Sequence, residues 1–374
     1  MPRKRRELPG AGQPSAKHVN LSTQRVVPMS SSITPLQPQS AVKDQLGRPV
    51  RDLRISVIDR CNYRCPYCMP EEVYGEAHEF LARKDWLTPG EIKRLAGLFA
   101  TLGVNKLRLT GGEPLLRRDL PAIVRGLAEL DGIEDLALTT NGARLAARAR
   151  ELKDAGLKRI TVSCDSLDPD IFRRMSGNRG DVDQVLEGIE AAIAVGFGPV
   201  KLNVVVQRGV NDHTVLDLLE RFRGTGVIVR FIEYMDVGTR NGWRADQVVS
   251  SKVLLEKIAE RWPVAPVTRN YRGEVAQRYA FADGGGEIGF ISSVSEPFCG
   301  DCHRARLSAD GTLYTCLFAA RGTELKGTLR AGASDADLVG LLQHVWRGRR
   351  DRYSEQRGEA LTERDRVEMY RMGG

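Results

Sequence analysis

The sequence predicts an α/β fold in which an incomplete (β/α)6 barrel of the TIM type is followed by a smaller α+β domain that caps it. Up to Pro263, strand-like segments alternate with helical patterns, and such repetition indicates a parallel sheet. After Pro263, turn residues and short alternating runs replace the helices. We therefore expect three parts: a tail over 1–46, a barrel over 47–264 and a capping domain over 265–374.

Residues 1–46 contain no Phe, Trp or Tyr and are rich in Pro, Ser and Gln, so we expect a disordered tail. The stretch 1–6 lacks the apolar core of a signal peptide, although an organellar transit peptide is an open alternative. Residues 1–43 hold seven Lys or Arg and one Glu, a net of +6 out of the chain's +8. The rest of the chain is therefore close to neutral, and its charge does not indicate a nucleic-acid partner.

The composition also bears on where the protein works. No apolar run approaches the roughly 18 residues that cross a bilayer, so we expect no membrane partner. Six of the seven Cys fall into two tight clusters, which is metal-site spacing rather than a disulfide framework. This pattern indicates a reducing compartment, and we expect a cytoplasmic protein.

Six β-branched or Leu-rich segments are expected to form the barrel strands. They are 53–58, 106–110, 135–140, 159–164, 200–206 and 227–232. The clearest helix begins at Thr88, which forms a capping box with Glu91, has Pro89 at its first position and is stopped by Gly103. Further helices are expected over 142–155, 181–195, 212–223, 250–261, 334–348 and 361–371.

Three thiols, Cys61, Cys65 and Cys68, lie within eight residues directly after the first expected strand. Thiolates are soft ligands that favour iron–sulfur clusters and zinc. With only three Cys nearby, one iron of a cubane [4Fe–4S] cluster would lack a protein ligand, and an open position is typical of a catalytic metal site. A zinc knuckle or a group of buried thiols is the alternative.

The Cys-x-x-x-Cys-x-x-Cys spacing, with Tyr67 before the last Cys, resembles the motif of the radical S-adenosylmethionine (SAM) enzymes. Gly111, Gly112 and Glu113, after the second expected strand, resemble the element of the same superfamily that holds the SAM amino group. The resemblance implies that SAM chelates the open iron and that a reduced cluster cleaves it to a 5′-deoxyadenosyl radical. It also implies SAM contacts at Tyr67, Gly112, Ser163 and Met235.

The predicted C-terminal domain holds a second group of three thiols: Cys299, Cys302 and Cys316. Arg304 and Arg306 stand two apart between the last two of them, so both should project to one side of a strand. Guanidinium groups suit phosphate oxygens, so a cluster with a spare iron beside two arginines indicates a polyphosphate pocket. A zinc ribbon that includes His303 is the alternative.

Together these features resemble the MoaA family, the GTP 3′,8-cyclases of molybdenum cofactor biosynthesis, over residues 50–374. The resemblance implies that the radical made at the first cluster abstracts H3′ of GTP held at the second, giving (8S)-3′,8-cyclo-7,8-dihydroguanosine 5′-triphosphate. It gives catalytic roles to the first three Cys and to Arg54, Lys201, Gly373 and Gly374. The family's GTP-binding positions match Arg54, Lys106, Arg108, Thr139, Lys201, Arg230, Arg304 and Arg306.

The same resemblance implies a lyase with two [4Fe–4S] clusters and SAM as cofactors and GTP as substrate. Reductive cleavage of SAM needs an external electron donor, of the flavodoxin or ferredoxin type. The next enzyme of the pathway, cyclic pyranopterin monophosphate synthase, would receive the product, and a homodimer is a further expectation. Cys164 is expected to be a small buried residue rather than a seventh ligand.

Two other functions stay open. A radical SAM peptide or protein maturase uses the same chemistry with an auxiliary cluster, but usually carries more Cys in its C-terminal part than the three present here. A zinc- or cluster-stabilised nucleic-acid-binding module would hold zinc, bind in a salt-dependent way and not turn over SAM. The stretch 284–289 satisfies G-x-G-x-x-G, but another short strand follows it, so we interpret it as a hairpin turn.

Overall fold

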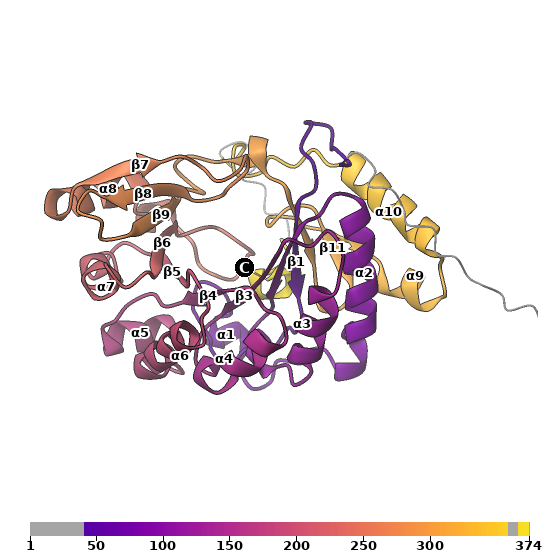
Figure 1. Cartoon of the computed structure of the whole chain (residues 1–374), viewed down its shortest axis with the longest axis horizontal. Helices are drawn as coiled ribbons and strands as arrows, with labels where there is room; N and C mark the ends of the chain where they lie inside the picture. The colour runs from indigo at the N-terminus through magenta and orange to yellow at the C-terminus, as the bar shows by residue number, and fades with distance from the viewer. Residues whose placement is uncertain (1–40, 358–365, 374) are drawn as a thin grey trace, which may run out of the picture. The chain divides into compact units, whose positions relative to one another are not determined.

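The computed structural model describes residues 41–357 and 366–373 of the 374-residue chain. The strands of this part form one twelve-stranded sheet in the order β12-β11-β10-β1-β2-β3-β4-β5-β6-β9-β8-β7 (Figure 1). Neighbours from β10 through β1 to β6 and β9 pair in parallel, whereas the pairs at both edges are antiparallel. The predicted fold class, an α/β partial barrel with a parallel sheet, is confirmed, and the structure adds antiparallel strands at both edges of that sheet.

All six predicted barrel strands are present, with bounds within two residues of the expected ones. They are β1 (Asp52–Ser56), β2 (Lys106–Thr110), β3 (Asp135–Thr140), β4 (Arg159–Ser163), β5 (Lys201–Val206) and β6 (Ile228–Glu233). The strands after residue 263 are β7 (Val264–Val267), β8 (Gln277–Phe281), β9 (Glu287–Ile291), β10 (Arg304–Leu307), β11 (Thr312–Tyr314) and β12 (Thr323–Glu324).

The expected helices up to 348 are all found. They are α2 (Pro89–Thr101), α4 (Leu145–Asp154), α6 (Val182–Ala194), α7 (Val215–Phe222), α8 (Ser251–Arg261) and α10 (Asp335–Arg347). The structure adds α1 (Glu71–Tyr74), α3 (Leu120–Ala128), α5 (Pro169–Met175) and α9 (Lys326–Arg330). α1, α5 and α9 are too short for periodicity to predict them, and in α3 the glycine Gly126 weakens the helical pattern.

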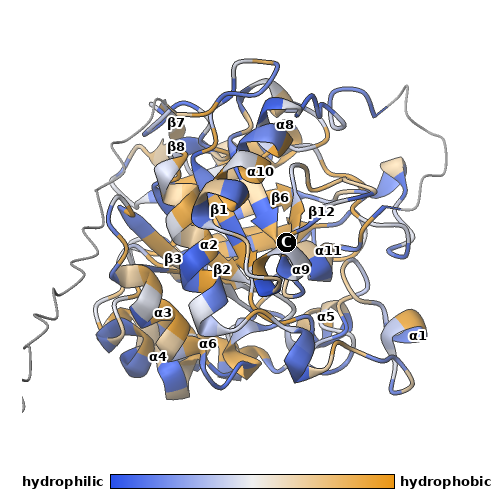
Figure 2. Cartoon of the chain, turned by 90° about the vertical axis from the view of Figure 1, so that its right-hand side faces the viewer, coloured by the Kyte–Doolittle hydropathy of each residue, from blue (hydrophilic) through white to orange (hydrophobic). Residues whose placement is uncertain are grey.

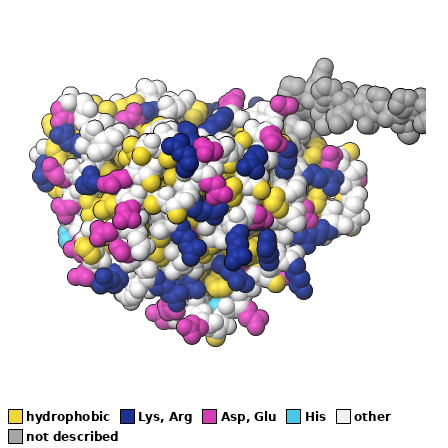
Figure 3. Space-filling view, turned by 60° about the horizontal axis from the view of Figure 1, so that its bottom comes forward, with side chains coloured by type: hydrophobic (Ala, Val, Ile, Leu, Met, Phe, Trp, Pro, Cys, Tyr) yellow, Lys and Arg dark blue, Asp and Glu magenta, His cyan; other side chains and the backbone are white. Residues whose placement is uncertain are grey.

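Charged side chains of both signs share the face of the molecule that Figure 3 presents, with Lys and Arg interspersed with Asp and Glu. Among the described residues, the search for membrane spans finds no helix with the length and hydropathy that crossing requires. In Figure 2 the helices that cover the sheet are part blue and part orange, as amphipathic helices are.

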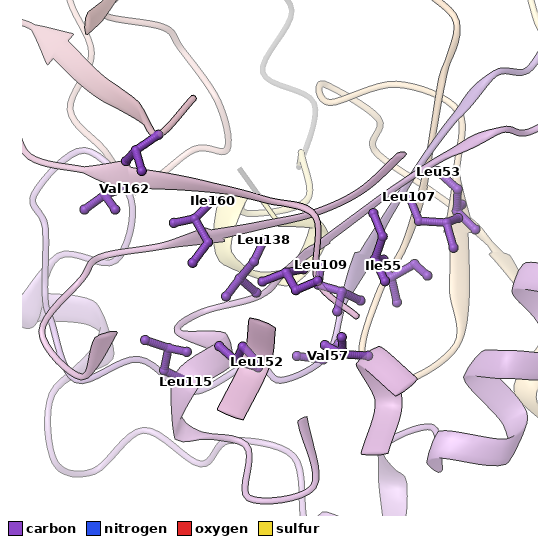
Figure 4. Packing of buried hydrophobic residues seen from close by; sticks show 14 of the residues in the cluster. Leu53, Ile55, Val57, Leu107, Leu109, Leu115, Leu138, Leu152, Ile160 and Val162 are labelled. Atoms are coloured by element: carbon purple, nitrogen blue, oxygen red, sulfur yellow. The ribbon is translucent and has the colours of Figure 1, made fainter. Parts of the chain in front are cut away.

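Alternation along the central strands decides what each face of the sheet carries. Leu53 and Ile55 on β1 are fully buried, as are Leu107 and Leu109 on β2. Figure 4 shows these side chains packed among those of the neighbouring strands and of the covering helices. The positions between them, such as Arg54, therefore face the opposite, inner side of the sheet.

The segment from residue 41 to β1 is packed against the rest of the chain. Val42 is buried and its N–H donates to Leu102 O, and Lys43 bridges to Pro49. Residues 41–46 fall within the expected tail, since local composition does not show such contacts, and the rest of that tail, 1–40, lies outside the described residues.

The expected C-terminal domain shares its sheet with the barrel. β10 pairs with β1 and β9 pairs with β6, so strands from beyond residue 264 flank both sides of the six barrel strands. The hairpin interpretation of 284–289 is confirmed, since residues 282–286 form the turn between antiparallel β8 and β9 and 287–289 begin β9. The helix expected over 361–371 is found only at Met369–Met372, and 358–365 lies outside the described residues.

Burial of Asp44 makes a stability prediction. Its carboxylate is fully buried and accepts from Arg48 Nε at 2.6 Å and from Arg349 Nη1 at 3.1 Å. Asp44→Ala would leave two buried guanidinium groups without that partner, so we expect the free energy of unfolding to fall by about 3–5 kcal/mol in urea denaturation.

The matched control for this prediction is Glu190→Ala. Glu190 pairs with Arg221 at the surface, where its side chain is 65% exposed, so its loss should cost less than about 0.5 kcal/mol. Equal destabilisation by the two variants would contradict the role given to Asp44.

Candidate active site

A cavity of about 720 Å³ runs along the inner face of the parallel strands. Its wall includes two sets of thiols: Cys61, Cys65 and Cys68 (the first triplet) and Cys299, Cys302 and Cys316 (the second triplet). The first triplet follows β1, and Cys302 precedes β10, which pairs in parallel with β1 so that Asp52 lies opposite Arg304. The two triplets therefore lie beyond opposite edges of the same strands, roughly 13 Å or more apart at 3.3 Å per residue.

The loop of the first triplet is a set of tight turns held by an arginine. The N–H groups of Cys68 and Met69 both donate to Cys65 O, at 2.9 and 2.8 Å. Arg64 is buried and donates from Nε to Tyr74 O at 2.6 Å and from Nη1 to Cys61 O at 2.9 Å. These bonds fix the backbone, so the three thiols are directed toward the cavity.

Gly111 and Gly112 are required by their contact with this loop. A Cβ at Gly111, whose φ is +150°, would lie 2.4 Å from Ile58 O, and one at Gly112 would lie 2.3 Å from Arg60 O. Only glycine therefore lets the end of β2 approach the thiol loop so closely.

Glu113 ties the ends of β2 and β3 together. Its Oε1 accepts from Leu115 N at 2.9 Å and Thr140 Oγ1 at 2.7 Å, and its Oε2 accepts from Asn141 N at 2.7 Å. Burial raises the pKa of Glu113 to about 7 despite these bonds. A carboxylate has about four acceptor sites, so one site on Oε2 is left for a ligand.

The second triplet lies in a basic surrounding. Arg304 Nη2 donates to Cys302 Sγ at 3.2 Å, and Arg349 Nη1 donates to Cys302 O at 2.7 Å. Burial opposes a charge on Cys302, but the two arginines outweigh it and lower its pKa to about 6. Cys316 follows β11, which is antiparallel to β10 and returns the chain to the same edge. Here burial and Asp351 raise the pKa of Cys316 to about 12.

His303, the fourth ligand of the alternative zinc site, is not part of the cavity wall. It is buried, and its imidazole lies where a Cβ on Gly273 would meet Nδ1 at 2.8 Å. Alternation along the chain therefore separates it from Cys302 and Arg304, which do line the cavity.

The residues expected to contact SAM and GTP all line this one cavity. They are Tyr67, Gly111, Gly112, Glu113, Ser163 and Met235, and Arg54, Lys106, Arg108, Thr139, Lys201, Arg230, Arg304 and Arg306. Strand register explains the basic group, since Arg54 lies opposite both Arg108 and Arg306. Thr139 on β3 accepts from Arg108 Nη1 at 2.9 Å. Their assignment to SAM or to GTP stays a prediction.

Each of these basic side chains makes it less favourable for its neighbours to carry a positive charge. Burial and then neighbouring arginines lower the pKa of Arg54, and the same two causes lower that of Arg230 to about 9 and that of Lys201 to about 7. Asp52 and Asp135 are each 3.8 Å from Lys106 and supply part of the opposite charge. An anionic ligand in the cavity would relieve the remaining repulsion.

The C-terminal segment reaches the same region. Arg306 Nη1 donates to Gly373 O at 2.6 Å, and a Cβ on Gly373, whose φ is +67°, would lie 2.0 Å from Thr110 Cγ2. Both Arg306 and Thr110 line the cavity, although Gly373 itself is not part of the wall. Gly374, the other tail residue expected to act in catalysis, lies outside the described residues.

Each triplet offers three thiols to a bound metal group. Among the residues that the structure describes, no three His, Cys, Asp or Glu side chains are placed to hold one metal ion. Thiols of one tetrahedral zinc would crowd around a single centre, whereas a cubane takes each thiolate on a different iron. Burial raises the pKa of Cys61 and of Cys68 to about 12, so their thiolates need positive charge that irons would supply.

Three residues of the site have no role assigned to them from the sequence, although two of them, Asn141 and Asp165, stand at strand ends where functional residues are expected. Asn141 Nδ2 lies 3.9 Å from Cys61 Sγ, and Asp165 accepts from Tyr67. Both follow barrel strands, and that position was the signal that could have identified them. Tyr271 accepts from Lys106 Nζ at 2.6 Å, but it belongs to a loop with no motif.

Comparison with known protein families divides the chain in two. The model of the radical SAM superfamily matches residues 55–222. The model described as Molybdenum Cofactor Synthesis C matches residues 227–355. A solved structure of Streptococcus suis SuiB bound to S-adenosylmethionine is similar in fold, with a TM-score of 0.54, 15% identity, and coverage of 79% of this chain and 68% of that one.

Curated relatives match nearly from end to end. A GTP 3′,8-cyclase of Xanthomonas campestris pv. campestris is 56% identical over 89% of this chain and 97% of its own length. The GTP 3′,8-cyclase of Acidothermus cellulolyticus is 53% identical over 84% of this chain and 88% of its own length. The GTP 3′,8-cyclase of Staphylococcus carnosus is 45% identical over 89% of this chain and 99% of its own length. The chain therefore belongs to the GTP 3′,8-cyclase family of the radical SAM superfamily.

Proposed function

We propose that the chain is a GTP 3′,8-cyclase, a lyase that joins C3′ of the GTP ribose to C8 of its guanine. The product would be (8S)-3′,8-cyclo-7,8-dihydroguanosine 5′-triphosphate, which enters molybdenum cofactor biosynthesis. The observation that carries this proposal is one cavity with a thiol triplet beyond each strand edge and a wall of Arg and Lys between them. Relatives named for this activity support it.

Each thiol triplet would hold three irons of a [4Fe–4S] cluster. When bound, the reduced first cluster and SAM together supply a carbon radical that can remove a hydrogen atom from a ribose. The chain's part at this end is to hold the SAM amino acid moiety, for which Glu113 keeps an acceptor site on Oε2. Tyr67, Ser163 and Met235 also line the cavity and would contact the adenosyl part of SAM.

At the other end the guanine would lie against the second cluster, with the triphosphate on the basic wall. Arg304 and Arg306 are adjacent to the second triplet, while Lys106 and Lys201 stand at the starts of β2 and β5. Arg54 is on β1, which lies between β10 and β2 in the sheet. Guanidinium groups grip phosphate oxygens in pairs, so this wall would orient the ribose toward SAM.

Other partners follow from the same proposal. An electron donor of the flavodoxin or ferredoxin type would reduce the first cluster, and a synthase acting on the cyclised nucleotide would take the product. A cytoplasmic location and a homodimer also belong to the proposal.

The peptide maturase is the rival with a specific prediction of its own. It shares the radical chemistry, but a peptide substrate would not need six or more basic groups converging inside the cavity. SAM turnover that depends on GTP would separate the two functions.

Iron content tests the two clusters separately. Replacing all three Cys of either triplet by Ala should lower the iron content from about eight to about four per chain after anaerobic reconstitution. Cys164→Ala is the control and should keep all the iron, because Cys164 is 1% exposed and donates to Ser166 O instead. Zinc bound at the second triplet would contradict the proposal.

Lys201 predicts a proton uptake on GTP binding. Its pKa is about 7 in the free cavity, so above pH 7 the amine is largely neutral, and a triphosphate beside it would raise that pKa. Calorimetry of wild type at pH 8 in buffers of different ionisation enthalpy should therefore show uptake, and GTP affinity should fall as the pH rises from 7. Lys201→Arg stays charged and should lose the uptake, whereas an unchanged uptake would contradict this role.

Gly373 predicts a requirement for the tail. Gly373→Ala forces a Cβ to within 2.0 Å of Thr110 Cγ2, so the tail must move, and turnover should fall about 100-fold while iron content stays unchanged. Gly332→Ala is the matched control, since Gly332 also has a positive φ, +86°, but nothing lies within 4 Å of its Cβ position. Chromatography of the product measures the turnover of both variants. Equal turnover by Gly373→Ala and Gly332→Ala would refute the requirement for the tail.

A further inference from the structure

A hydrogen bond crosses the inner side of the sheet at the first triplet. Tyr67 OH donates to Asp165 Oδ2 at 2.6 Å, and both side chains line the cavity. Tyr67 stands between Cys65 and Cys68 in the loop after β1, whereas Asp165 follows β4. Since β2 and β3 separate those strands in the sheet, this bond ties the thiol loop to a strand that is not its neighbour.

Asp165 is held rigidly from behind. Its Oδ1 accepts from Val205 N at 2.8 Å, and its carbonyl accepts from Asn211 Nδ2 at 2.7 Å. Asn211 is fully buried and donates as well to Val205 O at 2.9 Å. The carboxylate therefore presents Oδ2 to the cavity from a fixed position at the ends of β4 and β5.

A second tyrosine of the same loop, Tyr63, differs from Tyr67 in how its ring is held. Tyr63 is fixed by packing, with its ring 6.2 Å from that of Phe172, edge to face. Its hydroxyl is buried and has no hydrogen-bond partner in the part of the chain that the structure describes. Packing alone is thus enough to place an aromatic ring in this loop, and the bond from Tyr67 to Asp165 needs a reason of its own.

We propose that Asp165 is a positioning residue, which fixes the Tyr67 ring between Cys65 and Cys68 in the orientation that receives the adenosyl part of SAM. This inference rests on the proposed function, because it requires SAM at the first triplet. A tyrosine ring rotates about two bonds, and a rigid acceptor for its hydroxyl removes that freedom before the ligand arrives. SAM then binds without the cost of ordering the ring.

Three substitutions test the hydrogen bond between Tyr67 and Asp165. Asparagine has a single side-chain acceptor oxygen, so Asp165→Asn can accept from Tyr67 or from Val205 N, but not from both through separate oxygens as the carboxylate does. Tyr67→Phe removes the same bond from the other side and keeps the ring. Tyr63→Phe is the matched control, since the hydroxyl that it removes makes no such bond.

The experiment measures SAM binding to the reconstituted holoenzyme by equilibrium dialysis, and the change that SAM causes in the electron paramagnetic resonance spectrum of the reduced first cluster. We expect Tyr67→Phe and Asp165→Asn each to weaken SAM binding about tenfold and to alter that spectral change. The double variant should be no weaker than either single one, because both remove one bond. Tyr63→Phe should bind SAM like wild type, and iron content should be unchanged throughout.

Two results would overturn the inference. One is Tyr67→Phe behaving like Tyr63→Phe; the other is losses that add in the double variant, which would mean that the two residues act independently. Because Tyr67→Phe deletes a single oxygen atom, it decides the matter even if Asp165→Asn does not fold. A wild-type enzyme whose spectrum does not respond to SAM would instead refute the proposed function.

Discussion

Parallel pairing of β10 with β1 is the interaction on which the arrangement of the site depends. The two strands run in the same direction with Arg54 opposite Arg306, so whatever precedes β10 lies beyond the N-terminal edge and whatever follows β1 lies beyond the C-terminal edge. Cys302 and Cys61 are therefore separated by the length of the strands. An antiparallel β10 would have brought both triplets to one edge, and no chamber would lie between them.

The inner face of the sheet carries a charge that the fold alone does not balance. Asp52 partly offsets the effect on Arg54 of burial, of two neighbouring arginines of β10 and of a third on β2, and the pKa of Arg54 is still lowered. Burying unpaired cations costs free energy, which the apolar face of the same strands, with Leu53 and Ile55 fully buried, must offset. The site is thus positive before any ligand binds, and such a potential favours an anionic ligand in the cavity.

Sequence periodicity predicted the faces of the strands but not their neighbours. Alternation placed Arg304 and Arg306 on one side, and the Cys spacing identified both triplets. It could not show that β10 lies beside β1, because that contact joins residues some 250 positions apart through tertiary packing. For the same reason the packed segment at Val42 and the bond from Tyr67 to Asp165 were missed, since neither leaves a local pattern.

Two later segments of the chain contact residues of the cavity wall, one at each edge of the barrel strands. At the N-terminal edge, Tyr271 accepts from Lys106 at 2.6 Å, and Arg272 pairs with Asp301 at 2.8 Å. At the C-terminal edge, the tail reaches Arg306 through Gly373 O. All of these contacts involve chain from beyond the barrel. The chain after residue 264 therefore lines the cavity as well as carrying the second triplet.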